Sequence, residues 1–99
     1  MKSIIANLNK RFDNKVRLGI MSLLMVEEWV EFTKIKQLLE LTDGRLASHV
    51  KVLEDEGFLT LKKEFVGRKP KTSYKATKLG KKAFQDHLLA LEKLIKSLD

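Results

Sequence analysis

The sequence contains no cysteine, a single proline and no apolar run long enough to span a membrane. The absence of cysteine excludes disulfide bonds and thiolate metal sites and favours a reducing compartment, so we expect a cytoplasmic protein. The N-terminal stretch MKSIIANLNKRF is interrupted by Asn7 and Asn9 and is too short and too polar for a signal peptide. We therefore expect no association with a membrane.

Residue sets that carry catalysis or bind metals are also missing. The sequence has no Gly-rich phosphate loop, no Ser-His-Asp set and no pair of carboxylates in an apolar setting, so we expect neither an enzyme nor a cofactor. The two histidines, His49 and His87, fall in different predicted helices, and the side chains of Asp86 and His87 diverge by about 100° on a helix. We predict no metal site within one chain, although two protomers could assemble one across a dimer.

Positive charge is present, and it is concentrated in one segment. The net charge is +7, and nine basic residues with one acidic residue lie between Lys62 and Lys82. The rest of the chain is close to neutral. A basic cluster of this kind favours nucleic acid binding, because each phosphate that is neutralised releases condensed counterions. A solvated helix face explains the last lysines of the segment, Lys78, Lys81 and Lys82, equally well.

The spacing of apolar residues predicts helices over the first part of the chain. We expect a short first helix from four residues at helical spacing, Ile4, Ile5, Leu8 and Phe12. Asp13 would cap a second helix, which is apolar on nearly all sides and is therefore expected at the centre of the fold. An extended link from Trp29 to Phe32 leads to a third helix, capped by Thr33.

A fourth helix, over about residues 42–56, is predicted to have one buried face and one small polar face. Thr42 would cap it, and Asp43 adds negative charge where unpaired N–H groups lie. Gly57 would end it. The buried stripe recurs at helical spacing in Leu46, Val50 and Leu53.

The opposite face of this helix is short enough to lie deep in a groove. It consists of Gly44, Ser48, Lys51 and Asp55, with Arg45 at its edge. An ordinary solvated face would carry longer side chains. The pattern therefore favours contact with a large partner over simple exposure to water.

After Gly57 the apolar period changes from 3.6 to 2, which predicts a β-hairpin over about residues 58–76. The first strand has an apolar row of Leu59, Leu61 and Phe65 that Lys63 interrupts, and the second strand points Tyr74 and Ala76 inward. Between the strands lies VGRKPK, in which three of six residues are basic. Its glycine permits a turn, and its proline stiffens a charged tip, which lowers the entropy lost on docking.

The last helix, over about residues 78–98 and capped by Thr77, has more apolar surface than a small domain can cover. Packing against the chain's own core is one interpretation, and a shared interface between two chains is the one we favour. Ile4, Ile5 and Leu8 would join that interface. The heptad seam consists of Phe84, Leu88, Leu91, Ile95 and Leu98.

The run from Leu41 to Gly80, LTDGRLASHVKVLEDEGFLTLKKEFVGRKPKTSYKATKLG, resembles small winged-helix transcriptional regulators of the MarR/ArsR/PadR type. The helix motif T-x-G-x-L-x-x-H, the wing motif G-R-K-P-x-T-x-Y and T-x-x-G occur together at the family's spacing. The resemblance implies a mainly α fold with a small β-hairpin: a winged helix-turn-helix with N- and C-terminal dimerisation helices, forming one domain over residues 1–99.

By the same resemblance, the partners are a second copy of the chain and a partly palindromic double-stranded DNA site. Thr42–Asp55 would be the recognition helix and Phe65–Thr72 the wing. Arg68 would enter the minor groove, and the wing lysines would meet phosphates. The residues predicted to contact DNA are Thr42, Asp43, Gly44, Arg45, Ser48, Lys51, Arg68, Lys69 and Lys71.

Some roles stay open at this point. Asp43 either caps its helix, which we favour, or accepts from a cytosine amine. We interpret His49 as a packing residue with one polar contact rather than a base reader. A winged-helix module that binds protein or structured RNA remains the alternative function. One short N-terminal helix and one C-terminal helix leave little room for a ligand pocket, and the sequence names no effector.

Overall fold

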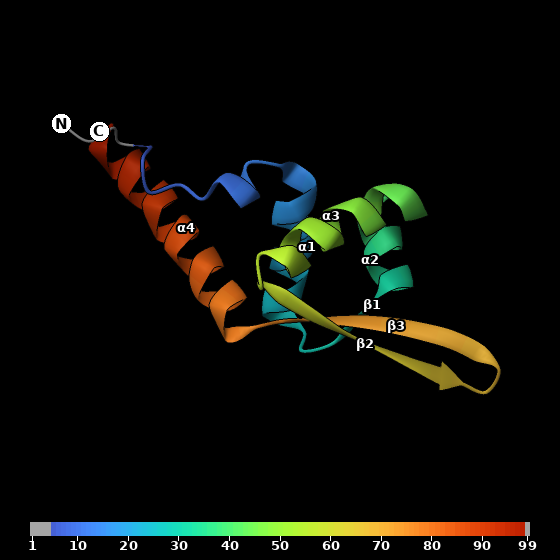
Figure 1. Ribbon diagram of the computed structural model, residues 1–99. Helices are drawn as coiled ribbons and strands as arrows, with labels where there is room; N and C mark the ends of the chain where they lie inside the picture. Colours follow the sequence, from blue (N-terminus) through green and yellow to red (C-terminus); the bar gives the residue numbers. More distant parts are fainter. Residues whose placement is uncertain (1–4, 99) are drawn as a thin grey trace.

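Two elements project in opposite directions from the centre of the structure, a computed structural model that describes residues 5–98 (Figure 1). One is the last helix, α4 (Lys78–Ser97), and the other is the hairpin of β2 (Leu59–Val66) and β3 (Lys69–Ala76). The molecule is 57 Å long but only 25 Å and 21 Å across. Both projections therefore offer surface that the core does not cover.

The core is built around α1 (Lys15–Val26), which is buried on several sides as its sequence predicts. Ile20 and Met21 at its centre are fully buried. The predicted cap, Asp13, is wrong by one residue. Asn14 lies in extended conformation, and its side-chain oxygen accepts hydrogen bonds from the first N–H groups of the helix.

The helix-turn-helix consists of α2 (Phe32–Leu39) and α3 (Asp43–Asp55). The predicted Thr33 cap is wrong, because α2 begins at Phe32 and its cap position is Glu31, two residues earlier, at the end of a strand and with no side-chain cap hydrogen bond. For α3 the prediction is confirmed: Thr42 Oγ1 accepts from the Arg45 N–H at 3.2 Å. The predicted buried stripe and the terminal glycine, whose φ is +78°, are confirmed as well.

The sheet has three strands where the sequence predicted two. β1 (Val30–Glu31) lies in the predicted extended link and pairs antiparallel with Tyr74 and Ser73 of β3, so the strand order is β1-β3-β2. A strand of two residues is too short to show a period of two. Its partner is more than 40 residues away in the chain, and local patterns cannot reveal such a pairing.

The hairpin turn is tighter than the predicted VGRKPK loop, because it contains only Gly67 and Arg68 between the strands. Gly67 has a φ of +66°, which a glycine adopts without strain. Pro70 belongs to β3 instead of the loop. β1 pairs with β3 at Ser73 and Tyr74, so at Pro70 the strand β3 has only β2 as a neighbour. A proline is tolerated at such an edge position because no second strand needs its missing N–H.

The apolar row of β2 leaves the core before it reaches the turn. Leu59 is buried and Leu61 is partly buried against the core, whereas Phe65 is 76% exposed. The predicted inward direction of Tyr74 and Ala76 is confirmed. The outer half of the hairpin, which we call the wing tip (Lys63–Lys71), therefore extends past the core.

The predicted first helix is not formed in residues 5–14. This stretch contains only a 3₁₀ turn, Lys10–Phe12, and Ile4 lies outside the described residues. The Asn9 side chain accepts from the Arg11 N–H at 2.8 Å and so stabilises a turn instead of a helix. Phe12 anchors the segment in the core through ring contacts with Phe58, Phe84 and His87.

The start of α4 is fixed against the end of α3 by what we call the Thr77 junction (Gly57, Phe58, Thr77 and Gly80). Thr77 caps α4 as predicted, accepting from the Gly80 N–H at 2.9 Å, and its hydroxyl donates to the Gly57 carbonyl at 2.6 Å. A Cβ on Gly80 would lie 1.9 Å from the Phe58 carbonyl oxygen. The T-x-x-G motif is thus a packing requirement.

Candidate nucleic-acid interface

The exposed face of α3 is small and polar over its first two turns. Gly44, Arg45, Ala47 and Ser48 are all exposed, and a Cβ added to Gly44 would meet nothing within 4 Å. The face is small and polar because the large apolar residues of the helix, Leu46, Val50 and Leu53, lie on its opposite, buried side. A surface of this shape can approach a groove floor closely.

Four cations on α3 and the wing tip have no carboxylate within ion-pair distance in residues 5–98. They are the arginine of the α3 face and three residues of the wing tip: Arg45, Lys63, Arg68 and Lys69. All four are exposed. An unpaired, exposed cation can bind a phosphate or a base without first breaking an internal contact, so these residues are the structure's strongest candidates for an anionic partner.

Two of the lysines predicted to contact DNA are engaged within the chain. The ammonium group of Lys51 lies 2.6 Å from Asp55, which raises the pKa of Lys51, and that of Lys71 lies 3.4 Å from Glu31. Exposed pairs of this kind contribute little to stability and are exchangeable. Both lysines can still meet phosphates, but only by exchanging one partner for another.

Asp43 is engaged as well, at the start of α3. Its carboxylate lies 2.9 Å from the ammonium group of Lys36 and sits in the first helical turn. That position gives it a favourable interaction with the positive end of the helix. The geometry supports a structural role for Asp43 over a contact with a cytosine.

A groove of about 360 Å³ runs between α3 and the wing. Lys51 and Glu54 line it from the helix, and Leu61 and Lys63 line it from β2. The sequence prediction did not include Lys63 among the contact residues. The sequence contained a signal for it, because Lys63 occupies a position in the alternating apolar row of the strand. A charged residue at such a position indicates that the buried part of that face has ended.

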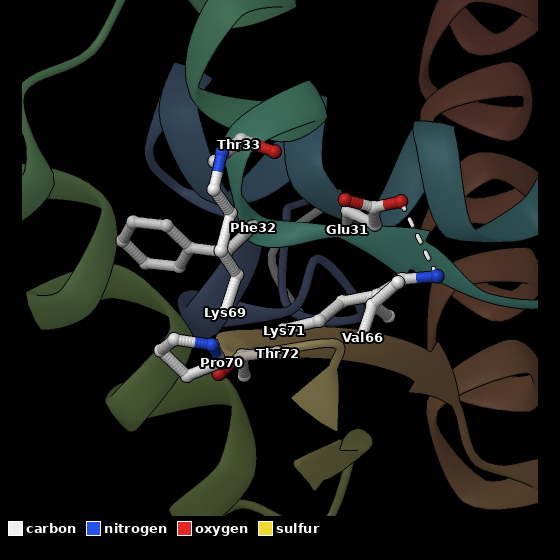
Figure 2. A pocket seen from close by; sticks show the side chains of 8 residues that line it. All are labelled: Glu31, Phe32, Thr33, Val66, Lys69, Pro70, Lys71 and Thr72. Carbon is white, nitrogen blue, oxygen red and sulfur yellow. Dashed lines mark ion pairs between the residues drawn. The ribbon is translucent and has the colours of Figure 1, made fainter. Parts of the chain in front are cut away.

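A second hollow, of about 440 Å³, separates the wing from the start of α2. Figure 2 shows the ion pair of Glu31 and Lys71 at one side of it, with Phe32 and Pro70 at the other. The pair ties β3 to the residue that precedes α2. Since α2 also packs on α1, the direction of the wing is set by the core as well as by its own turn.

A model of the family described as winged helix DNA-binding domain matches residues 16–95, a range that includes the helix-turn-helix and the wing. The chain belongs to this family. An uncharacterized protein of Methanocaldococcus jannaschii is 38% identical over 90 residues, which cover 91% of this chain and 98% of that protein. The predicted resemblance to winged-helix regulators is thereby confirmed.

Solved structures agree with the family. A transcriptional regulator homologue from Pyrococcus horikoshii OT3 is 34% identical and superposes with a TM-score of 0.86, over 97% of this chain and 93% of that one. PadR from Bacillus subtilis, solved in complex with operator DNA, is 24% identical, with a TM-score of 0.67 over 76% of this chain and 48% of that one. The second likeness shows the fold alone.

The histidines of this winged helix lie apart, on α3 and α4. His49 is half-buried, and its Nδ1 lies 3.3 Å from Arg17 Nη1, which confirms the single polar contact expected of it. His87 is buried, and its Nδ1 accepts from the Asn9 N–H at 3.0 Å. Within residues 5–98, no three His, Cys, Asp or Glu side chains gather as a metal ion requires, and no helix is long and apolar enough to cross a membrane.

Both histidines should make stability depend on pH. Burial lowers the pKa of His87, and burial together with Arg17 and Arg45 lowers that of His49. As pH falls below about 6.5, the unfolded chain therefore takes up protons before the folded chain does, and the free energy of unfolding decreases. For His87 the negative charge of Asp13 partly offsets this effect, because it raises the pKa of the imidazole. Stability should be full above about pH 7 and decline toward the pKa values of the folded state.

Urea denaturation at several pH values between about 5 and 8 measures this slope. The double variant His49→Gln, His87→Gln should lose most of it, and each single variant part of it. Glutamine at position 87 keeps an oxygen that can accept the Asn9 N–H. A wild-type protein with a flat profile over this range would contradict the prediction.

Proposed function

We propose that the chain is a transcriptional regulator without enzymatic activity, which binds double-stranded DNA in the cytoplasm as a homodimer and recognises a specific site. One observation carries the proposal: the small, exposed, polar face of α3 lies beside a wing tip on which Lys63, Arg68 and Lys69 have no ion-pair partner in residues 5–98. Membership of a winged helix DNA-binding family supports it. The exposed residues of α3 include only one apolar side chain, Ala47, which disfavours a protein-binding role.

In this proposal α3 lies in the major groove. The absence of a side chain at Gly44 allows the backbone to approach the DNA, and Arg45 forms a bidentate contact with a guanine edge. Thr42 and Asp43 mainly stabilise the helix start, where further N–H groups can meet a phosphate. Ser48 and Lys51 on the following turns reach bases or backbone.

The wing lies against the neighbouring minor groove. Arg68 occupies the turn and enters the groove, while Lys69 at the start of β3 contacts a phosphate. Lys71 contributes after it leaves Glu31 and Glu64. Lys63 adds a contact on the side of the wing that faces α3.

Dimerisation would use α4, which carries an uncovered apolar row in its second half. Ile95 is 65% exposed, Leu88 and Leu98 are also exposed, and Leu91 is half-buried. Phe84 is buried in the core of its own protomer, so the seam available to a partner begins at Leu88. Ile5 is exposed and Leu8 is half-buried near the same helix, and a two-fold axis there would pair two half-sites of a partly palindromic operator.

Arg45→Ala should weaken binding to a preferred site by about 1–3 kcal/mol, or roughly fivefold to more than a hundredfold, and binding to random DNA much less. The loss should be confined to the preferred site, because Arg45 is proposed to contact a base. Removal of a phosphate contact would instead weaken binding to all sequences alike. Binding titrations at one salt concentration, on a duplex selected from a random pool and on an unselected duplex, measure the two losses.

Lys93→Ala is the matched control, since Lys93 is exposed on α4 and has no ion-pair partner in residues 5–98. It should change neither affinity, and melting curves of both variants should match the wild type. Equal losses for Arg45→Ala on both duplexes would make Arg45 a phosphate contact. Unchanged binding on both would mean that α3 does not enter a groove, which favours the protein- or RNA-binding alternative.

A further inference from the structure

Phe65 is a large aromatic side chain that its own chain leaves open to solvent. It is 76% exposed, and its neighbour Val66 is 62% exposed. It shares a face of β2 with Leu59 and Leu61, but the core ends at Leu61. Burying a phenyl ring of this exposure in a partner releases substantial free energy, so the ring is a candidate contact.

The backbone holds this ring in a defined direction. Phe65 lies opposite Pro70 in the register of β2 and β3, two residues from a turn of only Gly67 and Arg68. A proline at the facing position restricts the backbone at the tip. The ion pair of Lys71 and Glu31, drawn in Figure 2, connects β3 to the residue before α2. The ring is therefore presented on a braced hairpin instead of a flexible loop.

The surroundings of the ring indicate which partner it fits. Lys63 lies on the same face two residues earlier, and Arg68 and Lys69 follow it at the turn. These three cations have no ion-pair partner in the part of the chain that the structure describes. An apolar ring edged by cations matches a surface that is anionic at its rim and apolar within, and the minor groove, with stacked bases between two phosphate rows, is such a surface.

An anionic lipid surface has the same sign of charge but fits less well. Membrane-binding elements present a broad apolar face, whereas the wing tip offers one ring and one valine. The exposed polar face of α3 beside the wing adds only the small side chain of Ala47 to this apolar area. The DNA minor groove needs only a single wedge.

We propose that Phe65 is an apolar wedge that enters the minor groove at the wing and partly unstacks one base step of each half-site. This inference rests on the DNA binding proposed above. Lys69 holds the flanking backbone and Arg68 lies in the groove beside the ring while the ring separates the bases. Unstacking from the minor groove bends the duplex toward the major groove, and so toward α3.

The test uses a duplex that the full-length wild-type protein selects from a random pool, with 2-aminopurine placed at single positions across both flanks. The fluorescence of this base rises when it loses its stacking neighbour. Wild-type protein at saturation should raise the signal at one step in each half-site. Phe65→Ala should remove that rise and weaken binding about tenfold or more, with the salt dependence unchanged because no phosphate contact is lost.

Lys69→Ala is the matched control on the same wing. It should reduce the salt dependence by about one unit per protomer and keep the fluorescence rise at saturation. Melting curves should show both variants folded, since neither side chain is buried. A rise that is lost equally in both variants would assign the unstacking to charge and overturn the wedge.

Two further outcomes separate this inference from the proposed function. If Phe65→Ala binds the duplex with wild-type affinity and signal, the wedge is overturned while DNA binding stands. If wild-type protein selects no duplex, both proposals fail. If it selects none but binds phosphatidylglycerol vesicles in a Phe65-dependent way, the ring serves a lipid surface.

Discussion

Gly80→Ala should lower the free energy of unfolding by about 3 kcal/mol or more, or prevent folding altogether. The added Cβ would lie 1.9 Å from the Phe58 carbonyl oxygen and 2.7 Å from its carbonyl carbon. The obstacle is backbone, which cannot rotate away as a side chain can. The same carbonyl accepts from the Thr77 N–H at 3.0 Å, so any shift that relieves the overlap also strains this bond.

Thermal melting or urea denaturation measures the effect, and Gly44→Ala provides a matched control. Alanine is the better helix residue by about 1 kcal/mol, and position 44 has open space, so this variant should be as stable as the wild type or up to about 1 kcal/mol more stable. For a chain of this size, the Gly80 variant should melt more than about 10 °C below the wild type. Equal melting of the Gly80 variant and the wild type would show that α4 does not press on Phe58.

Ile95→Asp should convert the proposed dimer to a monomer. Ile95 is 65% exposed in the protomer, so its replacement removes nothing from the protomer's core, but a charge there would be buried without a partner in a seam formed by α4. Sedimentation at micromolar concentration measures the mass. Binding to a palindromic duplex should also weaken, because two linked half-sites no longer act together.

Lys93→Asp is the control for this prediction, since it places the same charge on the same helix away from the seam. It should remain dimeric, and circular dichroism should show both variants with the helix content of the wild type. A wild-type protein that sediments as a monomer, or an Ile95→Asp protein that stays a dimer, would contradict an interface along α4.

The helices α1 to α4 and the hairpin of this fold could be predicted from the sequence, whereas the N-terminal segment and β1 could not. α3 and α4 each combine a threonine cap with a regular apolar stripe, and both caps lie at the predicted residue. The N-terminal segment has helical spacing too, but Asn9 turns its backbone instead. β1 depends on pairing with a strand far along the chain, which leaves no local pattern.

For the candidate interface, the sequence could predict which residue types are present but not which of them are already engaged. The exposure of Arg45 follows from its helical position. The pairing of Lys71 with Glu31 depends on the third strand, and the exposure of Phe65 depends on where the core stops. Both are properties of the assembled sheet, so the alternation of β2 and β3 alone could not reveal them.

The Thr77 junction also links α3 to α4, the two helices that would have to cooperate on DNA. It joins the turn after α3 to the first turn of α4 through the N–H and hydroxyl of Thr77, which donate to the Phe58 and Gly57 carbonyls, and through the close approach of Gly80 to Phe58. In the proposed dimer, the distance between the two α3 helices would be transmitted through this rigid joint. Substitutions on the exposed face of α3 could then alter which bases are preferred, while the separation of the half-sites, about one turn of the double helix, would stay a fixed property of the backbone.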